Sequence, residues 1–201
     1  MSELFGDRLF NALERTDPAP GMLLVAAPGL VAGEFTRSVV FVIEHGDTGT
    51  FGVNLVARSE LAVDEVMPEW LAITAKPKAL YVGGPLSRDT VLCVGVTKNR
   101  VDPSDNPQLT RCANRIVYVN GAADPAELAT QLDGVRLFAG FAEWAPGQLD
   151  EEIARGDWYI APALPGDILA PGPADLWSDV MRRQPAPLPA FATFPVDPRD
   201  N

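Results

Sequence analysis

Residues 21–58 read GMLLVAAPGLVAGEFTRSVVFVIEHGDTGTFGVNLVAR, and this stretch decides the fold. Two apolar runs, MLLVAA and SVVFVI, flank a loop that opens with Pro-Gly, and a third run, FGVNLVA, follows a polar turn. Apolar runs of about four to eight residues between turn formers are typical of buried strands. We therefore predict three consecutive strands. Polar residues gather at their joints, so the strand ends around Arg37 and His45 are the first place to look for a site.

The rest of the chain mixes strands and helices in an irregular order. We predict helices over residues 4–15, 61–67 with Ser59 as N-cap, 125–132 with Asp124 as N-cap, 146–155 and 176–183. Further strands are predicted at 80–82, 90–97, 116–119, 135–142 and 158–161, with a long loop over 99–114. This order lacks the regular alternation of a doubly wound sheet, and it favours an α+β fold with a mixed, mainly antiparallel sheet.

The length favours one domain with two appendages. The 201 residues suffice for a core that needs neither disulfide nor metal. We predict an N-terminal helical arm over residues 1–20, a single domain over 21–184, and an extended Pro-rich tail over 185–201. Cys93 lies in an apolar run and is predicted to be buried, whereas Cys112 lies in a polar segment and is predicted to be exposed.

The charge of the chain limits its partners. The formal net charge is −11, and non-specific DNA affinity comes from Lys and Arg that neutralise phosphates. Basic residues occur only in sparse pairs, such as Arg111 with Arg115, so direct DNA binding and binding to acidic membranes are not expected. The start MSELFGDRLF does not resemble a secretory signal, and no apolar run has the length of a membrane span, so we expect a soluble, cytoplasmic protein.

His45 is the single histidine of the chain and its most obvious titratable candidate. With Glu44 beside it and Asp47 nearby, it could act as a general base or as a pH-sensitive contact. The alternative is a polar turn in which these side chains only solvate the bend. One histidine without clustered thiols does not suit a zinc site, and we predict no metal and no cofactor.

Arg37 precedes the most apolar predicted strand. Its guanidinium could bind a carboxylate or phosphate with two hydrogen bonds. Alternatively, it forms a structural ion pair with Glu34, with Glu44, or with the acids Glu151 and Glu152.

Two further segments offer candidate site residues. Gly83 and Gly84 follow a strand, but the P-loop and dinucleotide-binding spacings are absent, so the glycines favour a close approach of backbone over a phosphate loop. No nucleophile elbow is present either.

The second segment is the predicted helix after Pro146. Leu149 and Ile153 face the core, while the face with Gln148, Glu152 and Arg155 lies elsewhere, and Glu151 can pair with Arg155. The ring of Trp144 could line a pocket beside the helix N-terminus, whose N–H groups attract anions. The alternative is a Trp-anchored corner between strand and helix.

Taken together, LLVAAP, FTRSVVFVIEH, FGVNLV, the turn Gly83-Gly84-Pro85-Leu86, GFAEWAPGQLDEEI and the following Trp158 resemble the YqgE/AlgH family over residues 21–177. The resemblance implies a bifurcated sheet folded into a pseudo-barrel with peripheral helices. It also implies a bacterial protein without established catalytic residues, in a family of which one branch is labelled as transcriptional regulators. Where relatives usually have Gly-Trp-Gly-Pro, this chain has Glu143-Trp144-Ala145-Pro146, so two additional side chains occupy the corner.

The leading hypothesis is a non-enzymatic, cytoplasmic module that binds a small anionic molecule or a protein partner. One alternative is a transcriptional regulator that acts indirectly or through weak DNA contact. The other is an enzyme that uses His45 as a general base. We predict no catalytic residues under the leading hypothesis, and the candidate ligand-binding residues are Arg37, Glu44, His45, Gly83, Gly84, Trp144, Gln148 and Glu152.

Overall fold

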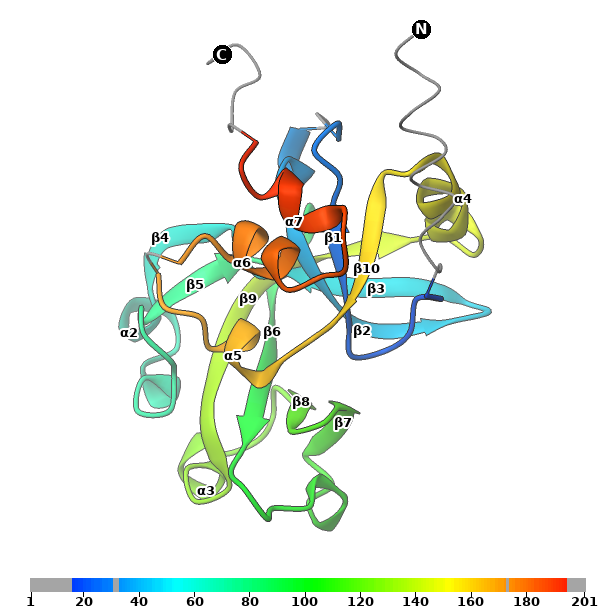
Figure 1. Cartoon of the computed structure of the whole chain (residues 1–201). Coiled ribbons are helices and arrows are strands. Elements are labelled where there is room, and N and C mark those ends of the chain that lie inside the picture. Colours follow the sequence, from blue (N-terminus) through cyan, green and yellow to red (C-terminus); the bar gives the residue numbers. More distant parts are fainter. Residues whose placement is uncertain (1–15, 31–32, 173, 195–201) are drawn as a thin grey trace, which may run out of the picture.

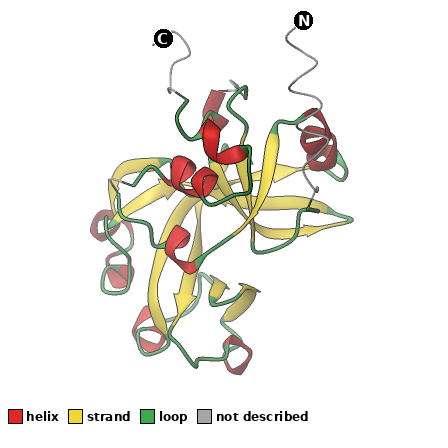
Figure 2. Ribbon diagram, in the orientation of Figure 1, coloured by secondary structure: helices red, strands yellow, loops and turns green. Residues whose placement is uncertain are grey.

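The computed structural model describes residues 16–30, 33–172 and 174–194. The helix predicted over residues 4–15 lies outside these ranges. Within the described part of the chain, ten strands form one sheet in the order β10-β1-β2-β3-β9-β6-β8-β7, with β5 paired to β9 and β4 to β5 (Figures 1 and 2). The strands are β1 Met22–Ala26, β2 Val39–Gly46, β3 Gly49–Asn54, β4 Arg58–Ala62, β5 Ala79–Val82, β6 Leu86–Thr97, β7 Leu109–Ala113, β8 Ile116–Val119, β9 Leu132–Trp144 and β10 Trp158–Pro162.

Strand β9 holds the sheet together (Figure 1). It pairs with β6 along most of its length, with β5 at residues 138–139, and with β3 at residues 142–144. The sheet therefore forks at β9 and curls into a half-barrel. Of the pairings between these named strands, only β5–β9 is parallel. The predicted α+β fold with a bifurcated, mainly antiparallel pseudo-barrel is confirmed.

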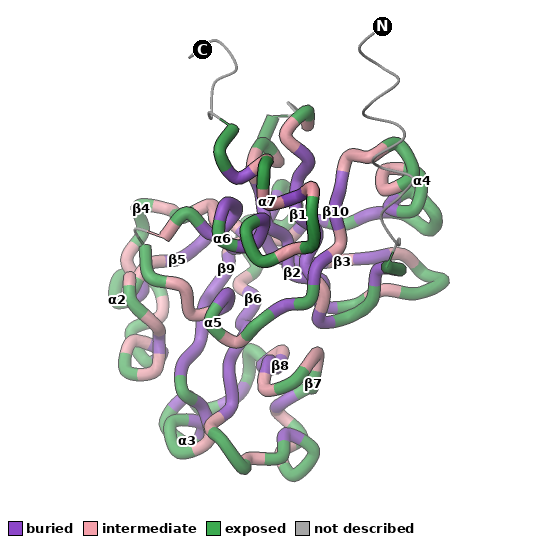
Figure 3. The backbone as a smooth tube through the Cα atoms, viewed as in Figure 1, coloured by how far each residue is buried: buried purple, intermediate pink, exposed green. Residues whose placement is uncertain are grey.

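Strands β1 and β2 are buried on both faces, which explains their uninterrupted apolar sequences. On one face, Leu23 and Phe41 pack in a cluster with Trp177. On the other face, Leu24 and Val40 pack with the tryptophans and the helix that form the site described below. In Figure 3 the central strands are largely buried, whereas the exposed residues lie mainly in the peripheral loops and turns.

Short helices cover the sheet. They are α2 Val63–Val66, α3 Pro125–Leu128, α4 Gln148–Arg155, α5 Pro165–Ile168, α6 Leu176–Arg182 and α7 Leu188–Phe191, with 3-10 turns η1 Gly33–Phe35, η2 Pro68–Trp70 and η3 Pro103–Asp105. The predicted cap of α3 is confirmed, because the Asp124 carboxylate accepts a hydrogen bond from the Ala126 N–H at 2.8 Å. None of the described helices is long and apolar enough to cross a membrane.

The prediction around Ser59 was wrong. Residues 58–62 form β4, because their backbone pairs with β5 far along the chain, and the Ser59 hydroxyl donates to the Leu80 carbonyl at 2.9 Å. The helix starts only at Val63, with Ala62 in the N-cap position. Long-range pairing thus overrides the local capping signal.

Other predicted boundaries shift for similar reasons. The predicted loop over 99–114 contains β7, an exposed edge strand whose polar residues hide its pairing with β8. The helix at 125–132 ends at Leu128, because Leu132 begins β9 and pairs with Thr97. The tail predicted to be extended forms α7 with Leu188 buried, since proline is compatible with the first turn of a helix.

The two cysteines are both free. Cys93 is buried, as predicted. Cys112 lies on β7 and is partly covered, where burial raises the pKa of its thiol to about 11. The prediction of an exposed Cys112 in a loop was therefore wrong: Cys112 lies at an irregularity of β7 between Arg111 and Ala113, which both pair with β8, and it packs against the core.

Candidate functional site

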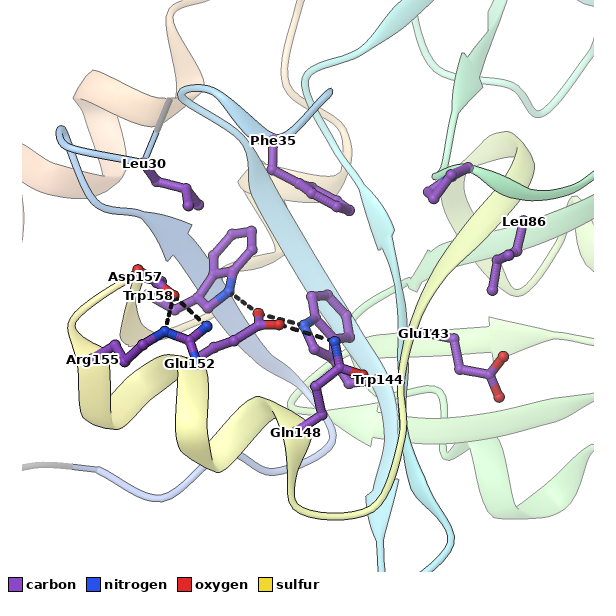
Figure 4. A pocket seen from close by; sticks show the side chains of 11 residues that line it. Leu30, Phe35, Leu86, Glu143, Trp144, Gln148, Glu152, Arg155, Asp157 and Trp158 are labelled. Atoms are coloured by element: carbon purple, nitrogen blue, oxygen red, sulfur yellow. Dashed lines mark hydrogen bonds and ion pairs between the residues drawn. The ribbon is translucent and has the colours of Figure 1, made fainter. Parts of the chain in front are cut away.

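A cleft of about 350 Å³ opens beside α4 (Figure 4). It lies between η1, which connects β1 to β2, and the turn at the start of β6. Its lining residues are Leu30, Phe35, Pro85, Leu86, Glu143, Trp144, Gln148, Glu152, Arg155, Asp157 and Trp158.

The path of the chain explains why two tryptophans meet in this cleft. Strand β9 ends at Trp144, and β10 begins at Trp158. In the sheet these strands are separated by β3, β2 and β1, so α4 has to cross the sheet to connect them. Gly147 and Gly156 flank the crossing helix, and both have a left-handed backbone that glycine adopts readily, with φ of 77° and 87°. Gly147 precedes the helix, and Gly156 ends it. The two indole rings lie edge to face at 5.8 Å.

The carboxylate of Glu152 links the side chains of Trp144, Trp158 and Gln148 in the cleft. Its Oε2 accepts hydrogen bonds from the indole N–H groups of Trp144 and Trp158, each at 2.8 Å. Its Oε1 accepts from Gln148 Nε2 at 3.0 Å, and Gln148 Oε1 accepts from the Ala145 N–H at 3.0 Å. Both tryptophans are nearly inaccessible to solvent, and an indole N–H can only donate, so a buried pair requires such an acceptor.

The walls of the cleft are aromatic and its charges are mostly negative. The ring of Phe35 lies 5.6 Å from that of Trp158 and 6.2 Å from that of Trp144. Arg155 pairs with Asp157 through two nitrogens, at 3.1 and 2.8 Å, instead of with the predicted Glu151. The lining thus holds three carboxylates, including Glu143, against one engaged guanidinium.

His45 lies in a different hollow. This hollow measures about 310 Å³ and contains His45, Asp47, Thr50 and Asp150 beside the start of α4. The Nδ1 atom of His45 is 2.6 Å from the Thr50 hydroxyl. Glu44 precedes it on β2 and is exposed. The structure therefore brings Trp144, Gln148 and Glu152 into one cleft and places Glu44 and His45 outside its lining.

Arg37 also lies outside the lining of the cleft. Its guanidinium pairs with Asp175 at 2.9 Å, so the predicted partners Glu34, Glu44, Glu151 and Glu152 were wrong. Glu34 pairs instead with Arg88. The sequence offers no signal for the Arg37–Asp175 pair, because the two residues are 138 positions apart.

Gly83 and Gly84 support the backbone, as the favoured interpretation of the sequence held. The Gly83 N–H donates to the Ala139 carbonyl at 2.9 Å, and a Cβ on Gly83 would come within 2.1 Å of the Gly140 carbonyl oxygen. Gly84 lies against the next residues of β9 and borders a third hollow, of about 280 Å³, which shares Phe35 with the cleft.

A Gly84→Ala variant tests this interpretation. Its Cβ would lie 2.2 Å from the backbone carbon of Phe141, and β9 cannot move without breaking its other pairings. We expect the free energy of unfolding to fall by about 3 kcal/mol, measured by denaturant titration. Gly121→Ala is the control, because a Cβ there meets nothing within 4 Å. Equal stability of the two variants would contradict the structural role of Gly84.

Several lining residues were not among the predicted site residues. Phe35 and Leu30 belong to the connection between β1 and β2, and only the folded sheet places them opposite α4. Asp157 and Trp158 follow Gly156, which ends α4 and directs them back toward Glu152. The spacing of Trp144, Gln148 and Glu152 on the corner and helix was the one signal available in the sequence.

The fold and the cleft define a class of α+β half-barrel proteins in which a crossover helix closes an aromatic cleft over the sheet. The chain belongs to the AlgH-like family, whose profile matches residues 23–189, so the resemblance to the YqgE/AlgH family is confirmed.

Relatives with similar sequences are UPF0301 proteins. One from Corynebacterium efficiens is 59% identical over the full length of both chains. One from Mycobacterium tuberculosis is 47% identical over 88% of each chain. A crystal structure of a protein from Corynebacterium diphtheriae has 58% identity and a TM-score of 0.91, covering 94% of this chain and all of that one. The solution structure of the AlgH protein from Pseudomonas aeruginosa has 19% identity and a TM-score of 0.64, covering 90% of this chain and 97% of that one, and it supports the fold alone.

Proposed function

We propose that the chain is a non-enzymatic binding module, and that its cleft receives an apolar or positively charged group of a small molecule or protein partner. One observation carries this proposal: the lining is largely apolar, with Leu30, Phe35 and Leu86 beside two nearly inaccessible tryptophans whose indole N–H groups are already paired with Glu152. Ligand sites commonly combine apolar walls with a few fixed polar groups.

The charges of the lining favour a cation over the anion expected from the sequence. Of the three carboxylates that line the cleft, Asp157 is paired with the single guanidinium, that of Arg155, so Glu143 and Glu152 leave the lining with an excess of negative charge. The start of α4, where helix N–H groups attract anions, borders the His45 hollow instead. Aromatic walls beside carboxylates suit an ammonium or guanidinium group.

The pairing within the cleft also argues against a role of Glu152 as a general base. Proton transfer requires a titratable group within reach of the substrate. The Glu152 carboxylate already accepts three hydrogen bonds from Trp144, Trp158 and Gln148, so its oxygens are committed to the fold. The cytoplasmic location stays a prediction.

Two-dimensional ¹H–¹⁵N NMR spectra of the ¹⁵N-labelled full chain test the proposal. The indole N–H signals of Trp144 and Trp158 serve as reporters, and that of Trp70, in another core cluster, serves as the internal control. We expect arginine amide and tetramethylammonium to change the chemical shifts of the two reporter signals in a saturable manner, and inorganic phosphate to leave these shifts unchanged. Phe35→Ala should weaken this response about 2- to 5-fold, as expected for the loss of one aromatic wall. A response to phosphate alone would favour the anionic ligand that the sequence predicted. The absence of a response to any probe would contradict a binding cleft.

The His45 hollow favours one alternative, an enzyme with His45 as general base. With Nδ1 engaged by Thr50, Nε2 is the nitrogen left for a substrate. This alternative predicts an activity that is lost in His45→Ala but kept in Glu44→Ala. The regulatory alternative predicts specific retardation of a promoter fragment in an electrophoretic assay at physiological salt.

A further inference from the structure

Arg37 occupies the point where the β1–β2 connection contacts the C-terminal helices. Its backbone has a φ of 52°, a left-handed conformation that residues other than glycine seldom adopt. Its guanidinium donates to the Asp175 carboxylate at 2.9 Å, to the Ser178 hydroxyl at 3.0 Å and to the Phe194 carbonyl at 2.9 Å. It also stacks 4.1 Å above the Trp177 ring. Such an arrangement of contacts holds both the side chain and the backbone of Arg37 in place.

The other end of the same turn carries a wall of the cleft. Ser38, directly after Arg37, donates hydrogen bonds to the Phe35 carbonyl from its N–H at 3.1 Å and from its hydroxyl at 2.8 Å. Phe35 in turn packs against Trp144 and Trp158. A displacement of Arg37 therefore changes the position of the Phe35 ring, two residues away.

Among the described residues, the direct hydrogen bonds between these parts all come from one side chain. Within the described residues, every hydrogen bond between the C-terminal segment 175–194 and the turn 33–38 involves the Arg37 side chain. The Trp177 indole donates at 2.8 Å to the Ala26 carbonyl of β1, and the Ala26 N–H donates to the Ser38 carbonyl at 3.0 Å, so this second connection is indirect and passes through the sheet. Helix α6 can thus remain seated on the sheet when the contact to the turn is lost.

We propose that Arg37 is a positioning residue through which the C-terminal segment 175–194 sets the aromatic wall of the cleft. The relevance of this coupling to ligand binding rests on the proposed function. The coupling is reciprocal by thermodynamic linkage: a group bound against Phe35 strengthens the seating of segment 175–194, and release of that segment weakens binding in the cleft. Arg37 itself does not contact the ligand.

The four tryptophans allow the proposal to be tested without a ligand. Indole N–H signals of the ¹⁵N-labelled full chain are compared between the native sequence and Arg37→Ala. We expect a change in the chemical shift of the Trp177 signal, because this indole loses its stacked guanidinium. We also expect changes in the Trp144 and Trp158 signals, because these indoles pack against the Phe35 ring. The Trp70 signal should stay in place. If only the Trp177 signal moves, Arg37 merely secures α6 and the proposal is wrong.

Two further variants keep the result decisive. Asp175→Asn removes one charge of the contact while asparagine still caps α6, so it should displace the same three signals by less, even if Arg37→Ala fails to fold. Arg182→Ala, which breaks an exposed ion pair on the same helix, should leave Trp144 and Trp158 unmoved. If the expected signal shifts occur but no cationic probe binds, the coupling holds and the proposed function fails. If a cationic probe binds but Arg37→Ala leaves the Trp144 and Trp158 signals in place, the proposed function holds and the coupling fails.

Discussion

A Glu152→Ala variant is expected to lose about 3 kcal/mol of its free energy of unfolding. The substitution leaves the buried indole N–H groups of Trp144 and Trp158 without their acceptor, and each unpaired buried donor costs about 1–3 kcal/mol. The Glu152 site is half-buried, so water can reach it in part, and the loss stays below the sum of the two largest penalties. Denaturant unfolding followed by far-ultraviolet circular dichroism measures the effect without depending on tryptophan emission.

The control for this prediction is Glu151→Ala. Glu151 is the exposed neighbour on the same helix and has the same intrinsic helix propensity. Its loss should change stability by no more than about 0.5 kcal/mol. If both variants are equally stable, the carboxylate does not hold the two tryptophans together, and the geometry of the cleft has to be explained otherwise.

The second large effect is expected at Arg136, which is 2% exposed and has no carboxylate partner among the described residues. Its guanidinium donates to the backbone carbonyls of Lys76, Pro77, Ile168 and Ala170, and it lies 4.5 Å from the centre of the Tyr81 ring. Burial lowers the pKa of this arginine, which shows the cost of keeping the charge inside.

Two effects oppose each other in Arg136→Met. The methionine removes the desolvation cost of a buried charge, but it leaves four carbonyl groups without their common donor. Because each unpaired group costs about 1–3 kcal/mol, we expect a net loss of about 3 kcal/mol in a denaturant titration. Arg111→Met, at an exposed ion pair, should lose less than about 1 kcal/mol. A fully stable Arg136→Met would show that desolvation outweighs the carbonyl contacts.

The parts of the fold that were predictable are those in which local sequence and long-range pairing agree. The runs before and after residues 27–38 are apolar on both faces, so β1, β2 and β3 followed from their pattern alone. Strand β4 and strand β7 were missed because their polar residues suit a turn or loop, and only their partners β5 and β8 make them strands.

The site was partly predictable for the same reason. Gln148 and Glu152 lie four residues apart on one helix, so their common face followed from helical geometry, and Trp144 was expected beside the start of that helix. Phe35 comes from more than a hundred positions away, and no local pattern places it opposite α4. For Arg37 the sequence left a ligand and a structural ion pair open, and the acid with which it pairs lies near the end of the chain.

The central position of β9 has a consequence for biosynthesis. This strand spans residues 132–144, whereas its partners β3, β5 and β6 begin at residues 49, 79 and 86. While the ribosome is still translating the codons before β9, the nascent chain therefore exposes the edges of three strands that await one shared partner. Unpaired edges recruit other chains, and pairing across long sequence separations is slow. The half-barrel can close only after β9 has left the exit tunnel, so we expect the emerging chain to be most prone to aggregation before that point.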